Sequence, residues 1–311
     1  MNVQWPEELE EVLAGDQVLA MASVTPARGV VVTPMTNFGP HDRSTGTARV
    51  NSSASANKKL DRTRRNPNVA LAFHTRHFST ASSRQYVLVQ GTATIGEPIE
   101  NYPATLGERW KEKEGPLPNA VWRRWLRIYY TRLSVDIAVR RIIVWPDLRA
   151  GGEPTIIGEA LSPPPSSQRP PAGGTAARVD CDRVAKAAGK LENLLLGWVG
   201  DDGLPVVVPV SVSTSGGDGS AVRLDAAAAI LPPGCRRAGL TAHEFSCHPT
   251  SEHERLYTGW LEVDDSGCTA NYYPHTDFGF YIPPSTLLYR LAMGFFTRRA
   301  VRSAPHKINA G

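Results

Sequence analysis

The feature that most constrains this fold is a strand pattern that occurs twice along the chain. The segment "KLENLLLGWVGDDGLPVVVPVSVST" follows the pattern of an earlier hairpin, with Pro209 in the place of Pro34. "RRAGLTAHEF" then matches "NPNVALAFHTRHF", and "ERLYTGWLEV" matches "RQYVLVQGTATI", with Gly259 against Gly91. Three matches in the same order, offset by roughly 170 residues, indicate a duplicated structural unit.

A Pro- and Gly-rich stretch separates the two copies. Residues 149–178 include Pro163, Pro164 and Pro165, and this composition disfavours both helix and sheet. The chain of 311 residues is long enough for two separate hydrophobic cores. The sequence therefore predicts a first domain over 1–148, a linker over 149–178 and a second domain over 179–311.

The first copy alternates short apolar runs with turn residues. The pattern predicts short helices over 6–13, 55–65, 102–113 and 119–127. It predicts six strands, at 16–24, 30–38, 47–53, 68–75, 84–95 and 132–145. Six short strands with helices outside them favour a β-barrel, so the expected class is mainly β with flanking helices. A last helix is expected over "TLLYRLAMGFFTRRAVR", which is too short to span a bilayer.

Composition narrows the setting in which the chain works. Hydrophobic residues make up 41% and charged residues 21%, without an apolar run of membrane-spanning length. The opening "MNVQWPEELEEVL" is acidic where an export signal is basic, so we expect a cytoplasmic protein without membrane contact. The four cysteines have irregular spacing and form no CxxC pair, which favours free thiols.

The segment "SASANKKLDRTRRNP" between two expected strands is strongly basic. Asn51, Ser52, Ser53 and Ser55 precede the expected helix, and such side chains together with free helical N–H groups suit a phosphate. Lysines one turn into the helix would balance its charge. A capped, solvated helix face is the alternative. The repeat has "DAAAAILPPGCRR" here, without either lysine, which favours a binding role present once per chain.

Nucleic-acid and metal sites have weaker support. The basic residues are not interleaved with aromatics, and the net charge is only +4. Several histidines and one cysteine could ligate a metal. Their spacing does not bring four donor side chains together, as a tetrahedral site requires, so no metal is expected. They are His74, His77, His243, Cys247, His248 and His253. A nucleophile elbow, a GxGxxG turn and a phosphate loop are all missing, so any chemistry would belong to a cofactor.

The first half resembles a known family in a specific order of motifs. The hairpin "VLAMASV…G…VVVTPM", then "ARVNSSASANKKLDRTRRNPNVALAF", "YVLVQGTATI" and "AVRRIIVWPD", is similar to the pyridoxamine 5′-phosphate oxidase-like, FMN-binding split β-barrels. The likeness covers most of Pro6 to Asp147, and the second half resembles the same fold more weakly. The resemblance implies two tandem split β-barrels.

The resemblance also implies a cofactor site. The flavin phosphate would be held by Ser52, Ser55, Lys58 and Lys59, with Arg49 on the preceding strand. Thr33, Pro34 and Met35 would lie along the flavin ring, and Val50 and Asn51 would present backbone groups to it. Such sites form between two barrels, so we expect an intramolecular pseudo-dimer or a homodimer. Trp260 and the region around His243 are candidate contributors from the second barrel.

By the same resemblance, the expected function is that of a flavin-dependent oxidoreductase acting on a small organic substrate. FMN is the first expectation for the cofactor, F420 is the alternative, and heme is less favoured. A non-catalytic flavin or heme carrier on the same fold is the alternative function, and a purely structural tandem barrel is a third. The residues that would recognise pyridoxamine phosphate are missing, so oxidation of vitamin B6 itself is not predicted.

Overall fold

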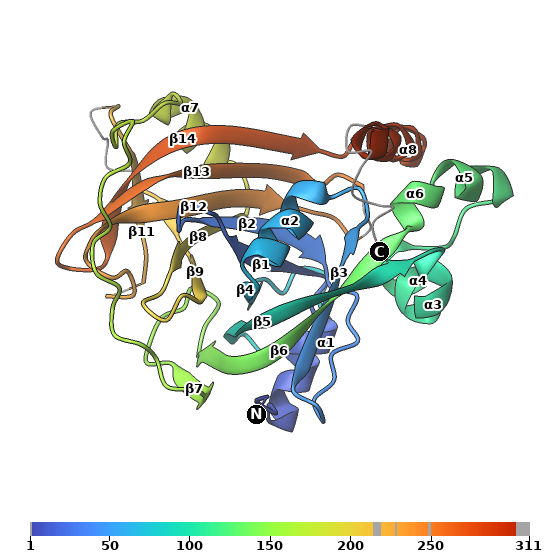
Figure 1. Ribbon diagram of the computed structural model, residues 1–311, viewed down its shortest axis with the longest axis horizontal. Helices are drawn as coiled ribbons and strands as arrows, with labels where there is room; N and C mark the ends of the chain where they lie inside the picture. The colour runs from blue at the N-terminus through green and yellow to red at the C-terminus, as the bar shows by residue number, and fades with distance from the viewer. Residues whose placement is uncertain (1, 214–218, 228, 248–249, 303–311) are drawn as a thin grey trace.

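Two antiparallel sheets, one from each half of the chain, pack against each other (Figure 1). The computed structural model describes residues 2–213, 219–227, 229–247 and 250–302. A cluster of short helices and the last helix lie together at one end of the molecule (Figure 1). No helix within the described ranges is long and apolar enough to cross a membrane.

The first half forms a sheet from the six strands that the sequence predicts. Its order is β2-β1-β4-β5-β6-β3, and β7 joins β6 at the side. The strands are β1 (Val18–Val24), β2 (Val30–Thr36), β3 (Thr47–Ser53), β4 (Asn68–Phe73), β5 (Tyr86–Ile99), β6 (Arg132–Trp145) and β7 (Thr155–Gly158).

The second half builds the same sheet from different residues. Its order, read from the other end, is β9-β8-β12-β13-β14-β11-β10, so each of the first six strands has a counterpart in the first sheet. The strands are β8 (Asn193–Val199), β9 (Pro205–Pro209), β10 (Ser211–Val212), β11 (Val222–Asp225), β12 (Gly234–Glu244), β13 (His253–Val263) and β14 (Thr269–Tyr281). This shared order confirms the predicted tandem of two split β-barrels.

Strand register confirms the equivalence residue by residue. Pro34 opposes Ala20 of β1, and Pro209 opposes Leu195 of β8. Gly91 and Gly259 each follow a register shift on the corresponding strands β5 and β13. A Cβ at either glycine would lie 2.2 Å from the carbonyl oxygen of Ala138 or Tyr273. Both copies therefore keep glycine because the neighbouring strand approaches too closely for a side chain.

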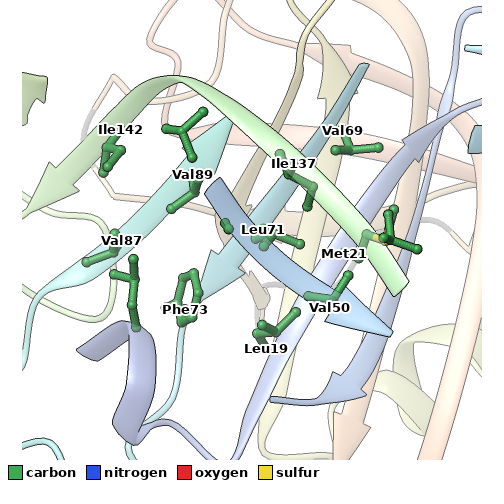
Figure 2. Close-up of a cluster of buried hydrophobic side chains, with 14 of the residues drawn as sticks. Leu19, Met21, Val50, Val69, Leu71, Phe73, Val87, Val89, Ile137 and Ile142 are labelled. Carbon is green, nitrogen blue, oxygen red and sulfur yellow. The ribbon is translucent and has the colours of Figure 1, made fainter. Parts of the chain in front are cut away.

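The core of the first barrel explains why its strands alternate (Figure 2). Leu19 and Met21 from β1, Leu71 and Phe73 from β4, and Val87 and Val89 from β5 point into one cluster with residues of β3 and β6. Strand residues two apart share a face of the sheet, so this pattern puts every second residue inside. A separate cluster, which includes Leu196, Leu240, Leu261 and Tyr272, fills the second barrel.

A third cluster joins the two barrels. Ala20, Val30, Val32, Ala72 and Tyr86 of the first barrel pack with Leu195, Val199 and Val207 of the second. Small residues allow close approach, since a Cβ at Gly239 would lie only 2.2 Å from the Val30 carbonyl oxygen. The outward face of β1 and β4 is thus buried by the second copy, which explains why β1 is buried at every position.

Buried hydrogen bonds cross this interface. Tyr86 Oη donates to the Val207 carbonyl at 2.6 Å, and Gln90 Nε2 donates to the Pro205 carbonyl at 2.6 Å. The buried Arg141 donates to Asp202 of the second barrel at 2.7 Å. A buried polar group without a partner costs free energy, so these bonds fix the relative position of the barrels.

The helices lie outside the sheets. They are η1 (Glu7–Leu9), α1 (Glu10–Gly15), α2 (Asn57–Arg65), α3 (Tyr102–Leu106), α4 (Glu108–Glu114), α5 (Ala120–Trp125), α6 (Arg127–Tyr130), α7 (Cys181–Ala188) and α8 (Thr286–Arg302). The last helix packs on the α5–α6 region, where Trp125 Nε1 donates to the Arg290 carbonyl at 2.9 Å. Several large apolar side chains on the outer face of α8 are exposed, among them Leu287, Leu291 and Phe295.

The predicted linker is more structured than its composition suggests. Residues 155–158 form β7, which pairs with β6, so the expectation that 149–178 holds no sheet was wrong. Gln168 is fixed to the second barrel, because its backbone N–H donates to the Cys235 carbonyl at 2.7 Å. An edge strand can offer free N–H and C=O groups to any extended segment, which composition alone does not reveal.

Candidate flavin phosphate site

The candidate site lies where β3 ends and α2 begins. Residues 54–56 carry the chain from the strand to the helix, and Ser53 Oγ lies 2.8 Å from Ser55 Oγ. The N-cap position of α2 is Ala56, whose side chain offers no cap. The first N–H groups of this nine-residue helix therefore lack the side-chain acceptor that usually satisfies them.

The basic residues of α2 point in different directions, as a helix of this length requires. Lys58 is exposed, whereas Lys59 is only partly accessible. Arg62 reaches back to the sheet and donates to Ser23 Oγ at 3.1 Å. Arg64 and Arg65 are exposed. The two lysines thus stay near the start of α2, while the arginines serve the sheet or face solvent.

Three buried polar atoms at this corner have no partner in the described structure. Asn51 Nδ2 and Ser52 Oγ belong to residues that are only 2% exposed, and the third is Nε of the partly accessible Arg132 on the neighbouring strand β6. Arg132 also reaches Asn51 Oδ1 at 3.4 Å. Buried polar atoms nearly always have partners, so orphaned donors beside an uncapped helix mark a place for an oxygen-rich ligand.

The second barrel supplies an acidic wall opposite these groups. Glu254, near the start of β13, interacts electrostatically with Lys59, and Glu252 lies two residues before Glu254. Burial lowers the pKa of Lys59 to about 8 and raises the pKa of Glu254 to about 7. Burial, with repulsion from Glu254 and Glu114, raises the pKa of Glu252 to about 8.

A third carboxyl group completes the wall from the first barrel. Glu114, at the end of α4, accepts a hydrogen bond from Thr36 Oγ1 at 3.3 Å, and burial raises its pKa to about 7. The Arg132 guanidinium lies 4.4 Å from the Tyr129 ring centroid. Its positive charge lowers the pKa of Glu114 and so offsets part of the increase that burial causes. These carboxyl groups keep part of their surface accessible although desolvation dominates their pKa.

The other residues that the resemblance implies have mixed placements. Arg49 is engaged with Asp136, with Nε to Oδ1 at 2.5 Å and Nη2 to Oδ2 at 3.1 Å. Val50 is fully buried in the barrel core. Thr33, Pro34 and Met35 lie on β2, where Pro34 is buried and the other two are partly accessible. The roles proposed for these residues stay predictions.

The two contributors expected from the second barrel lie in different places. His243 is buried, and its Nε2 lies 2.8 Å from Nε2 of His74. Trp260 is six residues beyond Glu254 on β13, buried, with the Arg237 guanidinium 5.8 Å from its ring centroid. Sequence reasoning pointed to neither Glu252 nor Glu254. The signal available was their position just before "RLYTGWLEV", the strand that matches β5.

The described histidines and Cys247 do not gather into a metal site. Among the described residues, no group of three His, Cys, Asp or Glu side chains could hold a metal ion. His77 instead contacts Glu192 at 3.3 Å, and His253 lies 3.9 Å from Glu244. His248 lies outside the described residues.

Comparison with known proteins gives structural neighbours of low similarity. No family model and no curated protein matches the chain. A pyridoxamine 5′-phosphate oxidase-related, FMN-binding protein from Nostoc punctiforme matches with 13% identity and a TM-score of 0.31, over 66% of this chain and 93% of its own. A pyridoxine phosphate oxidase family protein from Clostridium acetobutylicum, related to general stress protein 26, has 12% identity and a TM-score of 0.32, and the match covers 48% of this chain and 90% of that protein. A protein described as an F420 reductase has 19% identity and a TM-score of 0.31, and the match covers 44% of this chain and 98% of that protein.

The fold itself rests on the chain's own strand order. Both sheets follow one order and one register, and they bury a common interface. The chain is a tandem of two split β-barrels, the fold that its resemblance to the pyridoxamine 5′-phosphate oxidase-like proteins predicts.

Proposed function

We propose that this protein binds a phosphorylated flavin at the β3–α2 corner and works as a flavin-dependent oxidoreductase on a small organic substrate. The observation that carries the proposal is the coincidence, at one corner, of unpartnered atoms on Asn51 and Ser52, an uncapped helix and two lysines. FMN is the first candidate cofactor and F420 the second, since both carry a phosphate.

The residues present fit such a group. Lys58 and Lys59 would balance the phosphate charge, and the Ser52 hydroxyl would complete its hydrogen bonds. A bound flavin exchanges a hydride with its substrate, while the protein supplies orientation and electrostatics. Because the site lies between the barrels, the second barrel forms its other wall.

The carboxyl groups of that wall suit proton transfer. Glu114, Glu252 and Glu254 have pKa values raised to about 7, 8 and 7, so each is partly protonated near neutral pH. A group with a pKa near the working pH exchanges protons most effectively.

Equilibrium binding tests the proposal. The purified full-length chain is titrated with FMN, F420 and riboflavin, which lacks the phosphate, and binding is followed by flavin fluorescence. The proposal predicts that FMN or F420 binds and that riboflavin binds at least about 10-fold more weakly. Failure of both phosphorylated cofactors to bind would overturn it. Reduction of the bound flavin by a nicotinamide donor then separates an oxidoreductase from a carrier.

A further inference from the structure

A cavity between the barrels lies away from the candidate flavin site. Its volume is about 750 Å³, within the range of small-molecule pockets. One side is formed by the segment between β4 and β5 and by the turn after β6, including His74, Arg84 and Arg149. The other side is formed by β8, the β9–β10 segment and the end of β11, including Leu194, Val210 and Asp225.

This cavity is the pseudo-symmetric counterpart of the β3–α2 site. Val139 of β6 opposes the bulge glycine Gly91, and Pro274 of β14 opposes the bulge glycine Gly259. Four residues before these positions, Val135 opposes Val50 of β3 and Ala270 opposes Leu224 of β11. Val50 and Leu224 are therefore equivalent. Asp225, Ala226 and Ala227, which line the cavity, therefore correspond to Asn51, Ser52 and Ser53. Arg84 corresponds to Glu252, because each lies seven residues before its bulge glycine.

The charges of the two sites are inverted. At the β3–α2 site, the lysines come from the first barrel and the carboxylates Glu252 and Glu254 from the second. In the cavity, the second barrel supplies Asp225 and two alanines, and the first barrel supplies Arg84 and Arg149. Residues 226–227 and 229–233 form no helix, and Leu231 is buried. The helix start and lysines that would hold a flavin phosphate therefore have no equivalent here.

Two guanidinium groups remain for a ligand. Arg76 is held by Asp16 at 2.7 Å, and His77 contacts Glu192 at 3.3 Å. Asp147 Oδ1 accepts the backbone N–H groups of Arg149 and Gly151, at 2.7 and 3.2 Å. Arg84 and Arg149 are exposed, and within the described ranges no hydrogen bond or ion pair engages either guanidinium. Opposite them, Leu194, Leu195, Pro209 and Val210 form an apolar wall.

We propose that this cavity binds a small organic carboxylate with an apolar body. The carboxylate pairs with Arg84 and Arg149, since guanidinium groups form strong charge-assisted bonds to carboxylates. The apolar body lies against Leu194, Leu195 and Val210, where Asp225 excludes a second anionic group by repulsion. The site does not depend on the proposed flavin function, because the two sites share none of these residues.

Calorimetric titration of the full-length chain with benzoate, benzamide and benzylamine tests the charge requirement. The proposal predicts that benzoate binds and that neutral benzamide and cationic benzylamine bind at least about 10-fold more weakly. Arg84→Ala combined with Arg149→Ala should weaken benzoate binding about 10-fold or more. Arg123→Ala with Arg124→Ala, two exposed arginines of α5, is the matched control and should change it less than about 2-fold.

Several results would overturn the proposal. Absence of benzoate binding, equal binding of benzamide, or equal weakening in the control variant would each exclude a carboxylate site at Arg84 and Arg149. Competition of FMN with benzoate would also contradict it, because the cavity lacks the phosphate-binding elements. Unchanged benzoate affinity in the Lys58→Ala, Lys59→Ala variant would support a site separate from the flavin site, whatever that variant does to flavin binding.

Discussion

Nε2 of His74 lies 2.8 Å from Nε2 of His243, and the two residues occupy equivalent positions in the two barrels. His74 Nδ1 lies 3.1 Å from the Ala72 carbonyl oxygen, so that nitrogen carries the proton and donates. His74 Nε2 is then the acceptor, and His243 Nε2 donates to it. The barrels thus meet at a neutral, buried histidine pair on their pseudo-twofold axis.

This pair predicts a loss of stability in acid. Burial lowers the pKa of His74 from 6.5 to about 4, and burial with repulsion from His74 lowers the pKa of His243 well below its usual range. A depressed pKa contributes stability that is present above pH 6.5 and is lost as the pH falls toward 4. For His74 alone this is roughly 3 kcal/mol, at about 1.4 kcal/mol per pKa unit.

Urea unfolding from pH 7 to pH 4 measures this effect. The difference in unfolding free energy between the wild type and the variant His74→Leu, His243→Leu should fall over that range by more than the roughly 3 kcal/mol expected for His74 alone. The variant His275→Leu, which changes a half-buried histidine outside the interface, should follow the wild-type profile. A constant difference between wild type and double variant would contradict a neutral buried pair.

Ser52→Ala should separate stability from binding. Its hydroxyl is buried without a partner in the described structure, so removing it should leave the free energy of unfolding unchanged or raise it by about 1 kcal/mol. The same change should weaken FMN binding about 5-fold or more, because the phosphate loses a donor. Thermal unfolding and flavin fluorescence titration measure the two effects. Lower stability with unchanged affinity would show that the hydroxyl serves the fold instead.

The bulge glycines should resist substitution in both barrels alike. Gly91→Ala or Gly259→Ala places a Cβ about 2.2 Å from a backbone oxygen, which cannot move without breaking the sheet. Each change should cost about 2 kcal/mol or more of unfolding free energy, measured by urea titration. Thr94→Ala, at an exposed position of the same strand as Gly91, is the control and should cost less than about 1 kcal/mol. Tolerance of both glycine changes would argue against the observed register.

Flavin affinity should fall as the pH rises. Between pH 6 and 9, Glu252 and Glu254 lose protons at pKa values of about 8 and 7, and Lys59 loses its charge at about 8. All three changes make the site more negative, so they oppose a phosphate dianion. The dissociation constant of FMN should therefore rise over this range, and Glu252→Gln with Glu254→Gln should flatten the profile. Affinity that improves with pH would contradict this placement of charges.

The repeat made the fold predictable from sequence. Pro34 against Pro209 and Gly91 against Gly259 are local matches, and each returns in the same register of the folded sheets. Short apolar runs bounded by turn residues predicted six of the seven strands of the first sheet. Short β7 escaped prediction, since it depends on a free edge of β6 and not on its own composition.

The candidate site was predictable on one side only. The motif from Asn51 to Lys59 is continuous in sequence, so its chemistry is visible as a pattern. Glu252 and Glu254 lie near it only because the two barrels pack against each other, a long-range relationship that no local pattern contains. The ion pair of Arg49 with Asp136 was hidden for the same reason, because the partner lies on β6.

The most direct test of the account compares FMN with riboflavin in the wild type and in Lys58→Ala, Lys59→Ala. If the β3–α2 corner holds the phosphate, the lysine variant should lose about 10-fold or more in FMN affinity and leave riboflavin affinity unchanged. The variant Arg64→Ala, Arg65→Ala removes two charges from the same helix at exposed positions and should change FMN affinity less than about 3-fold. Equal FMN affinity in all three proteins would contradict a flavin phosphate at this corner.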